Sequence, residues 1–335
     1  MTKRINVTEY AQTMLGFDKI MILMHSHPDG DTLGTGIALL GALCALGKDA
    51  VAVCTDEPSC NTEFIKGYAD GTRCFFGNFE PQFFTPEHVV SVDIASIGLV
   101  GKALEEYSSK LELALDHHAV NTLECPYLFV EEQASSAGET MYFALREMER
   151  LSGKKLIDKN VACALYAAIA SDSGNFKYSS TSERTLVFAG ELIGLGADNA
   201  EISRKLFDIK TLGTFKAEAL CTENVTFFAD GKIAFSHMDR AQALERGIAE
   251  SEFDTCVQIL RMIKGVEVAI FAKEKTGDDG IVKYRLSLRS NEYVDVAEIA
   301  ATFDGGGHIR AAGCTVFGSL SEVIDKITAE VSKKL

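Results

Sequence analysis

The chain has 335 residues, 33 basic against 48 acidic, which gives a formal net charge of −15, and 47% of its residues are hydrophobic. This composition is typical of a globular protein with room for about two domains, and it excludes a disordered or fibrous chain. Because nonspecific duplex binding needs a basic surface, we do not expect such an acidic chain to bind long duplex nucleic acid. The longest apolar run, Val161 to Ala170, is far shorter than the ~20 residues that cross a membrane. A mixed polar stretch follows Lys3 and Arg4, so we expect no secretory signal, no membrane contact and a cytoplasmic location.

Short apolar runs alternate with helical patterns in the first half of the chain. Buried strands are predicted at Ile20 to Met24, Val51 to Cys54, Val89 to Val92 and Leu111 to Leu115. Helices are predicted at Thr32 to Leu46, Leu99 to Ser109 and Ala137 to Leu151. Asn160 to Ala170 is either a buried helix or a long apolar strand, because periodicity does not separate the two. The alternation is typical of a parallel sheet with crossover helices.

The second half shows paired strand signals instead. Asn224 to Phe228 and Lys232 to Phe235 flank an Asp-Gly turn, which indicates a hairpin. Val266 to Lys273 and Ile281 to Arg289 flank the polar loop Thr276 to Gly280, a second hairpin signal.

The two halves differ enough to predict separate domains. The segment between them is polar and helical, without strand signals, and is a good candidate for a linker. We therefore predict an α/β fold, with a parallel-sheet domain at residues 1–195, a helical linker at 196–218 and a smaller α+β domain at 219–335.

Histidines gather beside carboxylates in three short segments, which hold five of the seven: His25, His27, His117, His118 and His308. The first segment follows the predicted strand Ile20 to Met24, at the edge where open α/β sheets bind ligands. A tight turn there can aim His25, Asp29 and Asp31 into one volume, and such donors suit manganese or a similar divalent ion. The alternative is an ordinary Pro-Asp-Gly turn.

Three more apolar runs end in side chains of the same kind. Asp93 follows the strand Val89 to Val92, Asp116-His117-His118 follows Leu111 to Leu115, and Asp172 follows the apolar run that ends at Ala170. A single such residue is usually a cap or a hydrogen-bonded core residue. Four apolar runs with this ending favour a common site.

The charges favour two cations over one. Four carboxylates packed together would repel strongly, and two divalent ions balance them: Asp29, Asp31, Asp93 and Asp172. Two ions ~3.5 to 4 Å apart can activate water and hold phosphoryl oxygens, so phosphoester hydrolysis is the predicted chemistry.

A glycine-rich segment, Asp304 to Gly313, is the other unusual composition. Its three successive glycines, Gly305, Gly306 and Gly307, permit close backbone approach, and a following helix N-terminus would offer N–H groups to an anion. The side chains that could add positive charge for phosphate are His308, Arg310 and Arg289. The alternative is a glycine turn with a solvated arginine.

Together these motifs resemble the DHH phosphoesterase superfamily, in particular its members with a DHH-associated C-terminal subdomain. The matching motifs are His25-x-x-Pro28-Asp29-Gly30-Asp31, Asp93, Asp116-His117-His118, Asp172 and Gly305-Gly306-Gly307-His308. Within that superfamily, the length is most similar to the compact oligoribonucleases called nanoRNases, which also act as phosphoadenosine phosphate phosphatases.

The resemblance implies a role for each matched residue. One manganese ion would be held by His25, Asp29 and Asp93. The other would be held by Asp31, Asp93, His117 and Asp172. His118 would face the substrate phosphate, and Asp116 would orient a histidine ring. Arg289 and His308 would hold a phosphate of the substrate. With the residues that the glycine-rich composition already suggested, the predicted substrate-binding set is Arg289, Gly305, Gly306, Gly307, His308 and Arg310.

The resemblance therefore implies a two-metal phosphodiesterase and phosphatase, with Mn²⁺ as the expected cofactor and Mg²⁺ or Co²⁺ as alternatives. Its substrates would be short oligoribonucleotides and 3′-phosphoadenosine 5′-phosphate. A related alternative is cleavage of signalling dinucleotides such as cyclic di-AMP or pApA, and a different one is a nucleotide-binding regulatory module without catalysis. Whether the chain forms a homodimer stays open.

Overall fold

The computed structural model describes residues 2–276 and 282–335 and divides the chain into two compact units, Met1–Ile209 and Lys210–Leu335. The boundary between these units falls inside the predicted linker, and the three-part division of the chain stays a prediction. Among the helices of the described residues, none combines the length and the apolar character needed to cross a bilayer.

The first unit is built on a seven-stranded sheet. Its strands are β1 (Lys3–Arg4), β2 (Ile20–Leu23), β3 (Ala50–Cys54), β4 (Cys74–Phe76), β5 (His88–Val92), β6 (Leu111–Asp116) and β7 (Tyr127–Val130). All pairs are parallel, in the order β1-β7-β6-β5-β2-β3-β4. The strands β3 and β4 follow β2 on one side of it, whereas β5, β6 and β7 extend the sheet on the other side. The topological switch point of the sheet therefore lies between β2 and β5. Ligands bind at such a point, outside the carboxyl ends of the strands.

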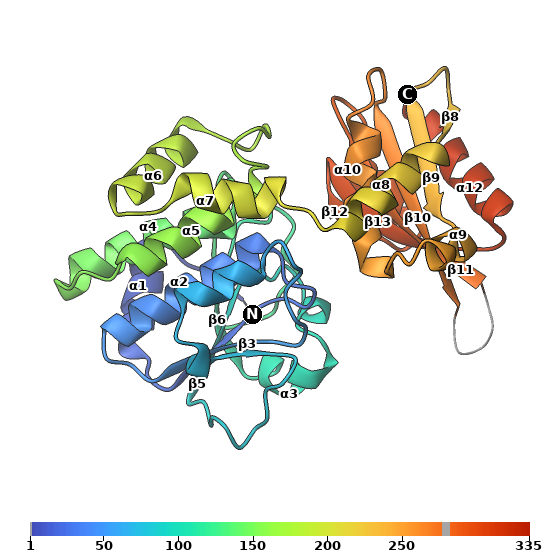
Figure 1. The fold of residues 1–335 in the computed structure, drawn as a ribbon. Coiled ribbons are helices and arrows are strands. Elements are labelled where there is room, and N and C mark those ends of the chain that lie inside the picture. Colours follow the sequence, from blue (N-terminus) through green and yellow to red (C-terminus); the bar gives the residue numbers. More distant parts are fainter. Residues whose placement is uncertain (1, 277–281) are drawn as a thin grey trace. The chain divides into compact units, whose positions relative to one another are not determined.

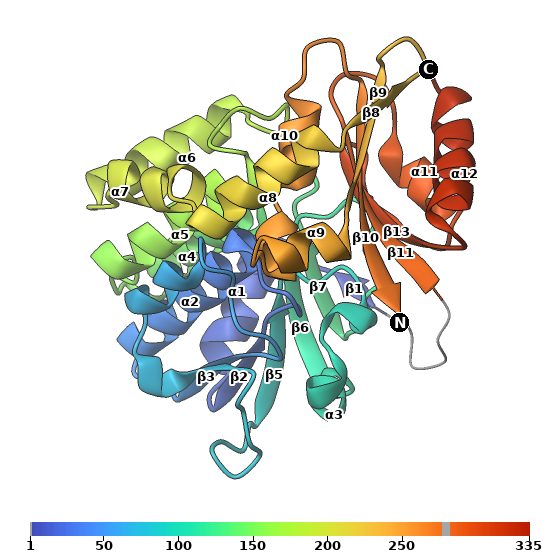
Figure 2. The ribbon, with the colours of Figure 1, turned by 45° about the vertical axis from the view of Figure 1, so that its right-hand side comes forward.

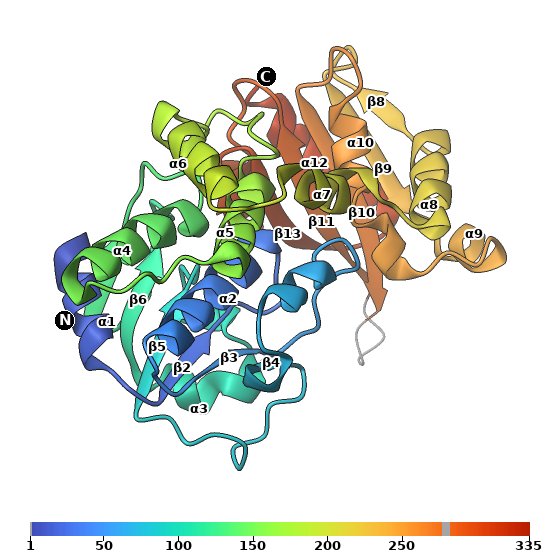
Figure 3. The ribbon, with the colours of Figure 1, turned by 60° about the vertical axis from the view of Figure 1, so that its left-hand side comes forward.

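Helices cover both faces of this sheet. They are α1 (Val7–Gly16), α2 (Gly30–Ala45), α3 (Glu105–Ser108), α4 (Ala137–Ser152), α5 (Lys159–Asp172), α6 (Glu183–Gly194) and α7 (Asn199–Ser203), which a π-helical turn at Arg204–Asp208 continues. The main core lies between the sheet and α1, α2, α4 and α5 (Figures 1 and 3). A second core lies under α3 and its neighbouring loops on the other face.

Two helix predictions for this unit need correction or completion. The segment from Leu99 to Ser109 is not one helix, because Gly101 has a φ of 84° and only α3 and short 3₁₀ turns at Ile97–Leu99 and Lys102–Leu104 form. The undecided run Asn160 to Ala170 is helical and lies within α5. Asp172 therefore ends a helix instead of a strand. The four predicted strands and the other two helices are confirmed, with ends that differ by one or two residues.

Helix α5 packs closely against α2, which places the end of α5 near the start of α2. A side chain at Gly34 of α2 would place a Cβ 2.3 Å from the carbonyl oxygen of Ala164 in α5, so only glycine allows this approach. Figure 1 shows the two helices side by side. The contact carries Asp172, at the end of α5, toward Asp31 in the first turn of α2.

The second unit is α+β. Its strands are β8 (Thr226–Phe228), β9 (Ile233–Met238), β10 (Val268–Thr276), β11 (Val282–Ser290), β12 (Gly306–His308) and β13 (Ala311–Phe317), in the order β12-β13-β11-β10-β9-β8. Its helices are α8 (Leu212–Glu223), α9 (Arg240–Glu245), α10 (Cys256–Arg261), α11 (Val296–Ala301) and α12 (Leu320–Ser332). Helices α8 to α10 pack on one face of the sheet and α11 and α12 on the other (Figure 2).

Both predicted hairpins of this unit form, because β8 pairs antiparallel with β9 and β10 with β11. Of the predicted loop Thr276 to Gly280, all but its first residue lie outside the described residues, as does Ile281. The parallel pair β9 and β10 was not predicted.

The glycine-rich segment is not followed by a helix, which corrects that prediction. It forms β12 and then turns into β13, because residues 311–317 extend along β11 and pair with it. Two of the glycines serve this turn: a Cβ at Gly305 would lie 2.3 Å from the Gly313 oxygen, and one at Gly307 would lie 2.4 Å from the Ala311 oxygen. Gly306 alone has open space around its Cβ position.

Candidate metal centre

Eight predicted residues of the first unit converge at the carboxyl end of its sheet. They form three groups within which the ligand atoms lie within 4.8 Å of one another: Asp93, Asp116, His117 and His118; His25, Asp29 and Asp93; and Asp31, His117 and Asp172. Asp93 and His117 each belong to two groups. The three groups are thus parts of one cluster at the switch point between β2 and β5.

The ring of His25 is oriented by its own turn. Its Nδ1 donates to the carbonyl oxygen of Ser26 at 2.8 Å, which leaves Nε2 as the lone-pair nitrogen of the neutral ring. Nε2 lies 3.6 Å from Asp29 Oδ1 and 3.5 Å from Asp93 Oδ2. These separations are longer than direct hydrogen bonds and close to those between ligands that share one metal ion, about 3 to 3.5 Å.

The start of α2 places two carboxylates. Asp29 is the N-cap, and its Oδ1 accepts from the backbone N–H groups of Asp31 and Thr32 at 2.9 and 3.1 Å. Asp31 is buried, and its oxygens accept from the N–H groups of Ala137 and Gly138, at the start of α4, at 2.7 and 2.9 Å. The first turns of two helices therefore fix these two carboxylates.

Asp93 lies at the centre of the cluster and is strained and incompletely bonded. It follows β5 directly with a φ of 57°, a conformation that costs energy for a residue other than glycine. Its side chain is 4% exposed, and Oδ1 has no hydrogen-bond partner among the described residues. A buried carboxylate oxygen without a donor is costly, and a cation at this position would remove that cost.

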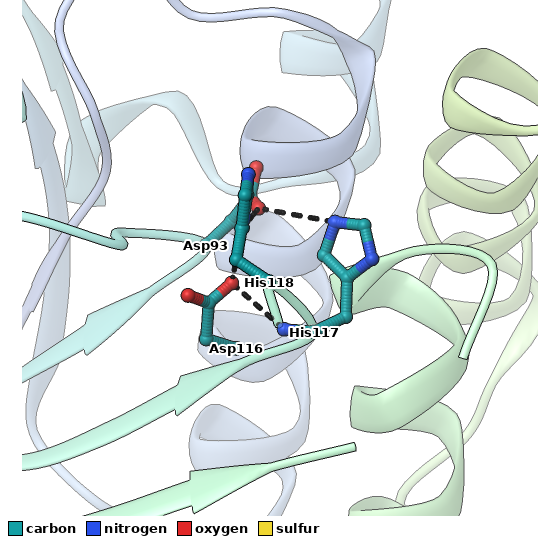
Figure 4. Close-up of side chains that lie close together, drawn as sticks. All are labelled: Asp93, Asp116, His117 and His118. Carbon is teal, nitrogen blue, oxygen red and sulfur yellow. Dashed lines mark hydrogen bonds and ion pairs between the residues drawn. The ribbon is translucent and has the colours of Figure 1, made fainter. Parts of the chain in front are cut away.

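The two histidines after β6 have different surroundings (Figure 4). The Nδ1 of His117 lies 3.4 Å from the carbonyl oxygen of Ala134, so its Nε2 faces the carboxylates. That Nε2 lies 3.7, 3.8 and 3.6 Å from oxygens of Asp31, Asp93 and Asp172. The Nδ1 of His118 is instead 2.7 Å from Asp116 Oδ1, a direct hydrogen bond.

The electrostatics of the cluster follow from burial and crowding. Burial and the neighbouring carboxylates raise the pKa of Asp31 and Asp93, and burial with the charge of Asp29 raises the pKa of Asp172 to about 7. Burial opposes protonation of His118, but the hydrogen bond and charge of Asp116 outweigh it and raise the pKa of His118 to about 9. Carboxylates that repel one another in this way fit divalent cations, which would remove the repulsion.

Three supporting groups were not predicted from the sequence. Asn121 donates from Nδ2 to Asp116 Oδ2 at 2.6 Å and so fixes the carboxylate that holds His118. The N–H groups at the start of α4 hold Asp31, as described above. Buried Glu139 lies in the first turn of the same helix. A sequence signal existed for the helix start, because Ser136 is an N-cap residue type three residues before Glu139.

The substrate-binding residues predicted for the second unit lie near one edge of its sheet, where β11 and β12 flank β13. The Cα positions of Arg289 in β11 and His308 in β12 are each paired with that of Ala311 in β13, so they share one row of the sheet. Arg310 donates to the carbonyl oxygens of Val294, at 2.9 Å, and Glu292, which is a structural use of its guanidinium. The predicted phosphate contacts of these residues stay a prediction.

Comparison with known proteins places this geometry in a family. The model of the DHH family, N-terminal domain, matches residues 19–169, and that of the DHHA1 domain matches residues 230–335. The chain belongs to the DHH family. This family membership confirms the resemblance seen in the motifs and makes the chain a phosphodiesterase or phosphatase hydrolase.

Relatives match along nearly the whole chain. A protein of Thermus thermophilus named bifunctional oligoribonuclease and PAP phosphatase NrnA is 27% identical over 321 residues, which is 94% of this chain and 90% of the relative. A protein of Bacillus subtilis with the same name is 28% identical over 327 residues, 97% of each chain. The crystal structure of an exopolyphosphatase-related protein from Bacteroides fragilis has a TM-score of 0.85 at 20% identity, covering 98% of this chain and 96% of that one. The structural match confirms the α/β fold.

Proposed function

We propose that this phosphoesterase is manganese-dependent, degrades short oligoribonucleotides to mononucleotides, and removes a phosphate from 3′-phosphoadenosine 5′-phosphate to give AMP. The observation that carries the metal dependence is the convergence of carboxylates and imidazoles on Asp93, whose buried Oδ1 has no hydrogen-bond partner among the described residues. The names of the Thermus and Bacillus relatives, which match over at least nine-tenths of their length, support the substrates.

The donor set supports two ions. We assign His25, Asp29 and Asp93 to one ion, with Asp31, His117 and Asp172 to the other and Asp93 shared. Carboxylates suit Mg²⁺ and Mn²⁺, whereas imidazole favours later transition metals, so a mixed set favours Mn²⁺ over Mg²⁺. When bound, a pair of such ions would activate the attacking water and stabilise the charged phosphoryl oxygens.

The remaining residues act on the substrate and on the ligands. Asp116 Oδ1 accepts a hydrogen bond from Nδ1–H of His118 and favours the charged ring, so we assign His118 Nε2 to a hydrogen bond with a phosphoryl oxygen of the substrate. The Nδ1 atoms of His25 and His117 face backbone carbonyl oxygens, which accept hydrogen bonds from them. Each Nε2 therefore stays available as a metal ligand. We assign Arg289, the glycines at 305–307, His308 and Arg310 to the sugar-phosphate of the substrate.

The net charge of −15 supports the preference for small substrates. A long polyanion meets repulsion over much of an acidic surface, whereas a dinucleotide needs favourable contacts only at the site.

One set of assays tests the proposal. The purified chain is given pApA, longer oligoribonucleotides, 3′-phosphoadenosine 5′-phosphate and cyclic di-AMP, with Mn²⁺, Mg²⁺ or Co²⁺ and then with chelator. We expect turnover of pApA and phosphoadenosine phosphate with Mn²⁺, and loss of turnover with chelator. His117→Ala should be inactive, whereas His88→Ala, a histidine in β5 outside the cluster, should be active.

Each contrary outcome has a meaning. Turnover that persists with chelator or in His117→Ala would contradict the metal-dependent mechanism. Preferred turnover of cyclic di-AMP would favour the signalling-dinucleotide alternative, and binding without turnover of any substrate would favour the regulatory module.

A further inference from the structure

The loop between β7 and α4 touches two of the assigned metal ligands. The carbonyl oxygen of Ala134 is the partner of His117 Nδ1 at 3.4 Å. At the other end of the loop, the N–H groups of Ala137 and Gly138 donate to the two oxygens of Asp31 at 2.7 and 2.9 Å. Since both contacts are made by the backbone, the position of this loop sets the positions of both side chains.

Glu139 holds this loop from inside the protein. Its side chain is 1% exposed, and Oε2 accepts from the N–H group of Ser135 at 3.0 Å and from the Ser135 hydroxyl at 2.7 Å. Ser135 lies in the middle of the loop, between the residue that contacts His117 and the residues that contact Asp31. A shift of Glu139 would therefore move both contacts.

The carboxylate is in turn held by α6. Thr185 donates its hydroxyl to Glu139 Oε2 at 2.7 Å, and Arg184 donates from Nε to Oε1 at 2.6 Å. Arg184 also lies 3.4 Å from Glu131. Burial acts to raise the pKa of Glu139, but the hydrogen bonds of Ser135, Thr185 and Arg184 outweigh it and lower the pKa. An ionised group buried this deeply is costly unless every contact is made.

We propose that Glu139 is a positioning residue for the metal centre, which links α6 to the loop that fixes Asp31 and His117. This inference rests on the proposed metal-dependent function. Groups that orient metal ligands typically affect metal affinity by about 10- to 100-fold when changed. Since Glu139 acts through Ser135 and the backbone, we expect the lower end of that range.

The test measures Mn²⁺ binding directly. Chelator-treated, folded protein is titrated with Mn²⁺ by calorimetry, with turnover of pApA measured separately over a range of Mn²⁺ concentrations. Glu139→Gln keeps the shape of the side chain but removes its charge and turns one acceptor into a donor facing Arg184 or Ser135. We expect a roughly tenfold weaker Mn²⁺ affinity, and a kcat that recovers at saturating Mn²⁺.

Helix α4 supplies a matched control at its other end. Glu149 accepts from the N–H groups of Leu156 and Ile157 at 2.8 and 3.1 Å, and from Arg146 at 2.6 Å, so it holds the following loop by the same chemistry. Glu149→Gln should lower the melting temperature without changing Mn²⁺ affinity. Should Glu139→Gln not fold, Ser135→Ala removes only the hydroxyl link to Glu139 and should weaken Mn²⁺ binding by about threefold, half of the tenfold effect in free-energy terms.

The outcomes separate this inference from the proposed function. Wild-type affinity in the folded Glu139→Gln and Ser135→Ala proteins would overturn the role of Glu139, and so would an equal loss of affinity in Glu149→Gln. A wild-type chain that binds no Mn²⁺ would instead contradict the proposed metal dependence.

Discussion

Replacing Asp172 by Asn is expected to stabilise the metal-free protein at alkaline pH, although it removes a proposed metal ligand. Burial and the charge of Asp29 raise the pKa of Asp172 from 3.8 to about 7. Because the folded-state pKa lies above the unfolded one, the contribution of this group to stability is fully present below pH 3.8. It is lost as the pH rises to about 7. An amide at this position does not ionise and avoids that loss.

The size of the effect follows from the pKa difference and from exposure. The interval between 3.8 and about 7 corresponds to about 4 kcal/mol of lost stability at ~1.36 kcal/mol per pKa unit. The Asp172 side chain is 33% exposed, so solvent screening reduces this value, and we expect about 2 kcal/mol. For a unit of this size, that corresponds to a rise in melting temperature of about 4 to 8 °C.

The assay is thermal unfolding with chelator, followed by circular dichroism from pH 4 to pH 8. The gain of Asp172→Asn over the wild type should grow from pH 4 to about 7 and then level off. Asp29→Asn is the control of opposite sign: desolvation by burial is outweighed by the hydrogen bond and charge of His25, together with the backbone N–H groups of Asp31 and Thr32, which lower the pKa of Asp29 to about 2, so its ionised form stabilises the fold. The reasoning would be refuted if Asp172→Asn and the wild type had the same melting temperature at pH 8. It would also be refuted if the gain in melting temperature at pH 4 were as large as the gain at pH 8.

Three further changes test other parts of the structure. Asn121→Ala should lower kcat on pApA about tenfold without unfolding the protein, because Oδ2 of Asp116 loses the donor that fixes this carboxylate beside His118; wild-type kcat would argue against this support. Gly34→Ala should lower the free energy of unfolding by about 1–3 kcal/mol in denaturant titrations, since its Cβ would collide with the Ala164 oxygen. Arg289→Ala should raise KM for pApA by about 10- to 100-fold, as expected for a lost charged hydrogen bond to phosphate, with Mn²⁺ affinity unchanged. A normal KM would remove Arg289 from the substrate site.

The strands and their ends could be predicted because burial on both faces leaves a simple pattern. The predicted strands β2, β3, β5 and β6 are almost unbroken apolar runs. Side chains that can bind a metal ion follow the apolar runs of β2, β5 and β6 directly. Parallel strands bring such ends to one edge, so the position of His25, Asp93 and His117 followed from local sequence. Short edge strands such as β1 and β4 carry no comparable pattern, since they have only two or three residues.

The supporting contacts could not be predicted, because they join residues far apart in the chain. Asp31 accepts from residues more than 100 positions later, and Glu139 binds a helix 45 positions away. Such contacts depend on how helices pack, which hydrophobic periodicity does not specify. The glycine-rich segment was misread for a related reason: the close backbone approach that its glycines permit is made with β13, and this strand follows the segment where a helix was expected.

Asp172 lies in the cluster, although the reason for expecting it there was partly wrong. It was expected at the end of an apolar run, and that run is the helix α5, which is not part of the sheet. Here glycines in α2 let α5 approach, and Gly34 in particular leaves no room for a Cβ against Ala164. The apolar small-residue composition of both helices, rather than a strand, is therefore what carries the fourth carboxylate to within 3.6 Å of the His117 ring.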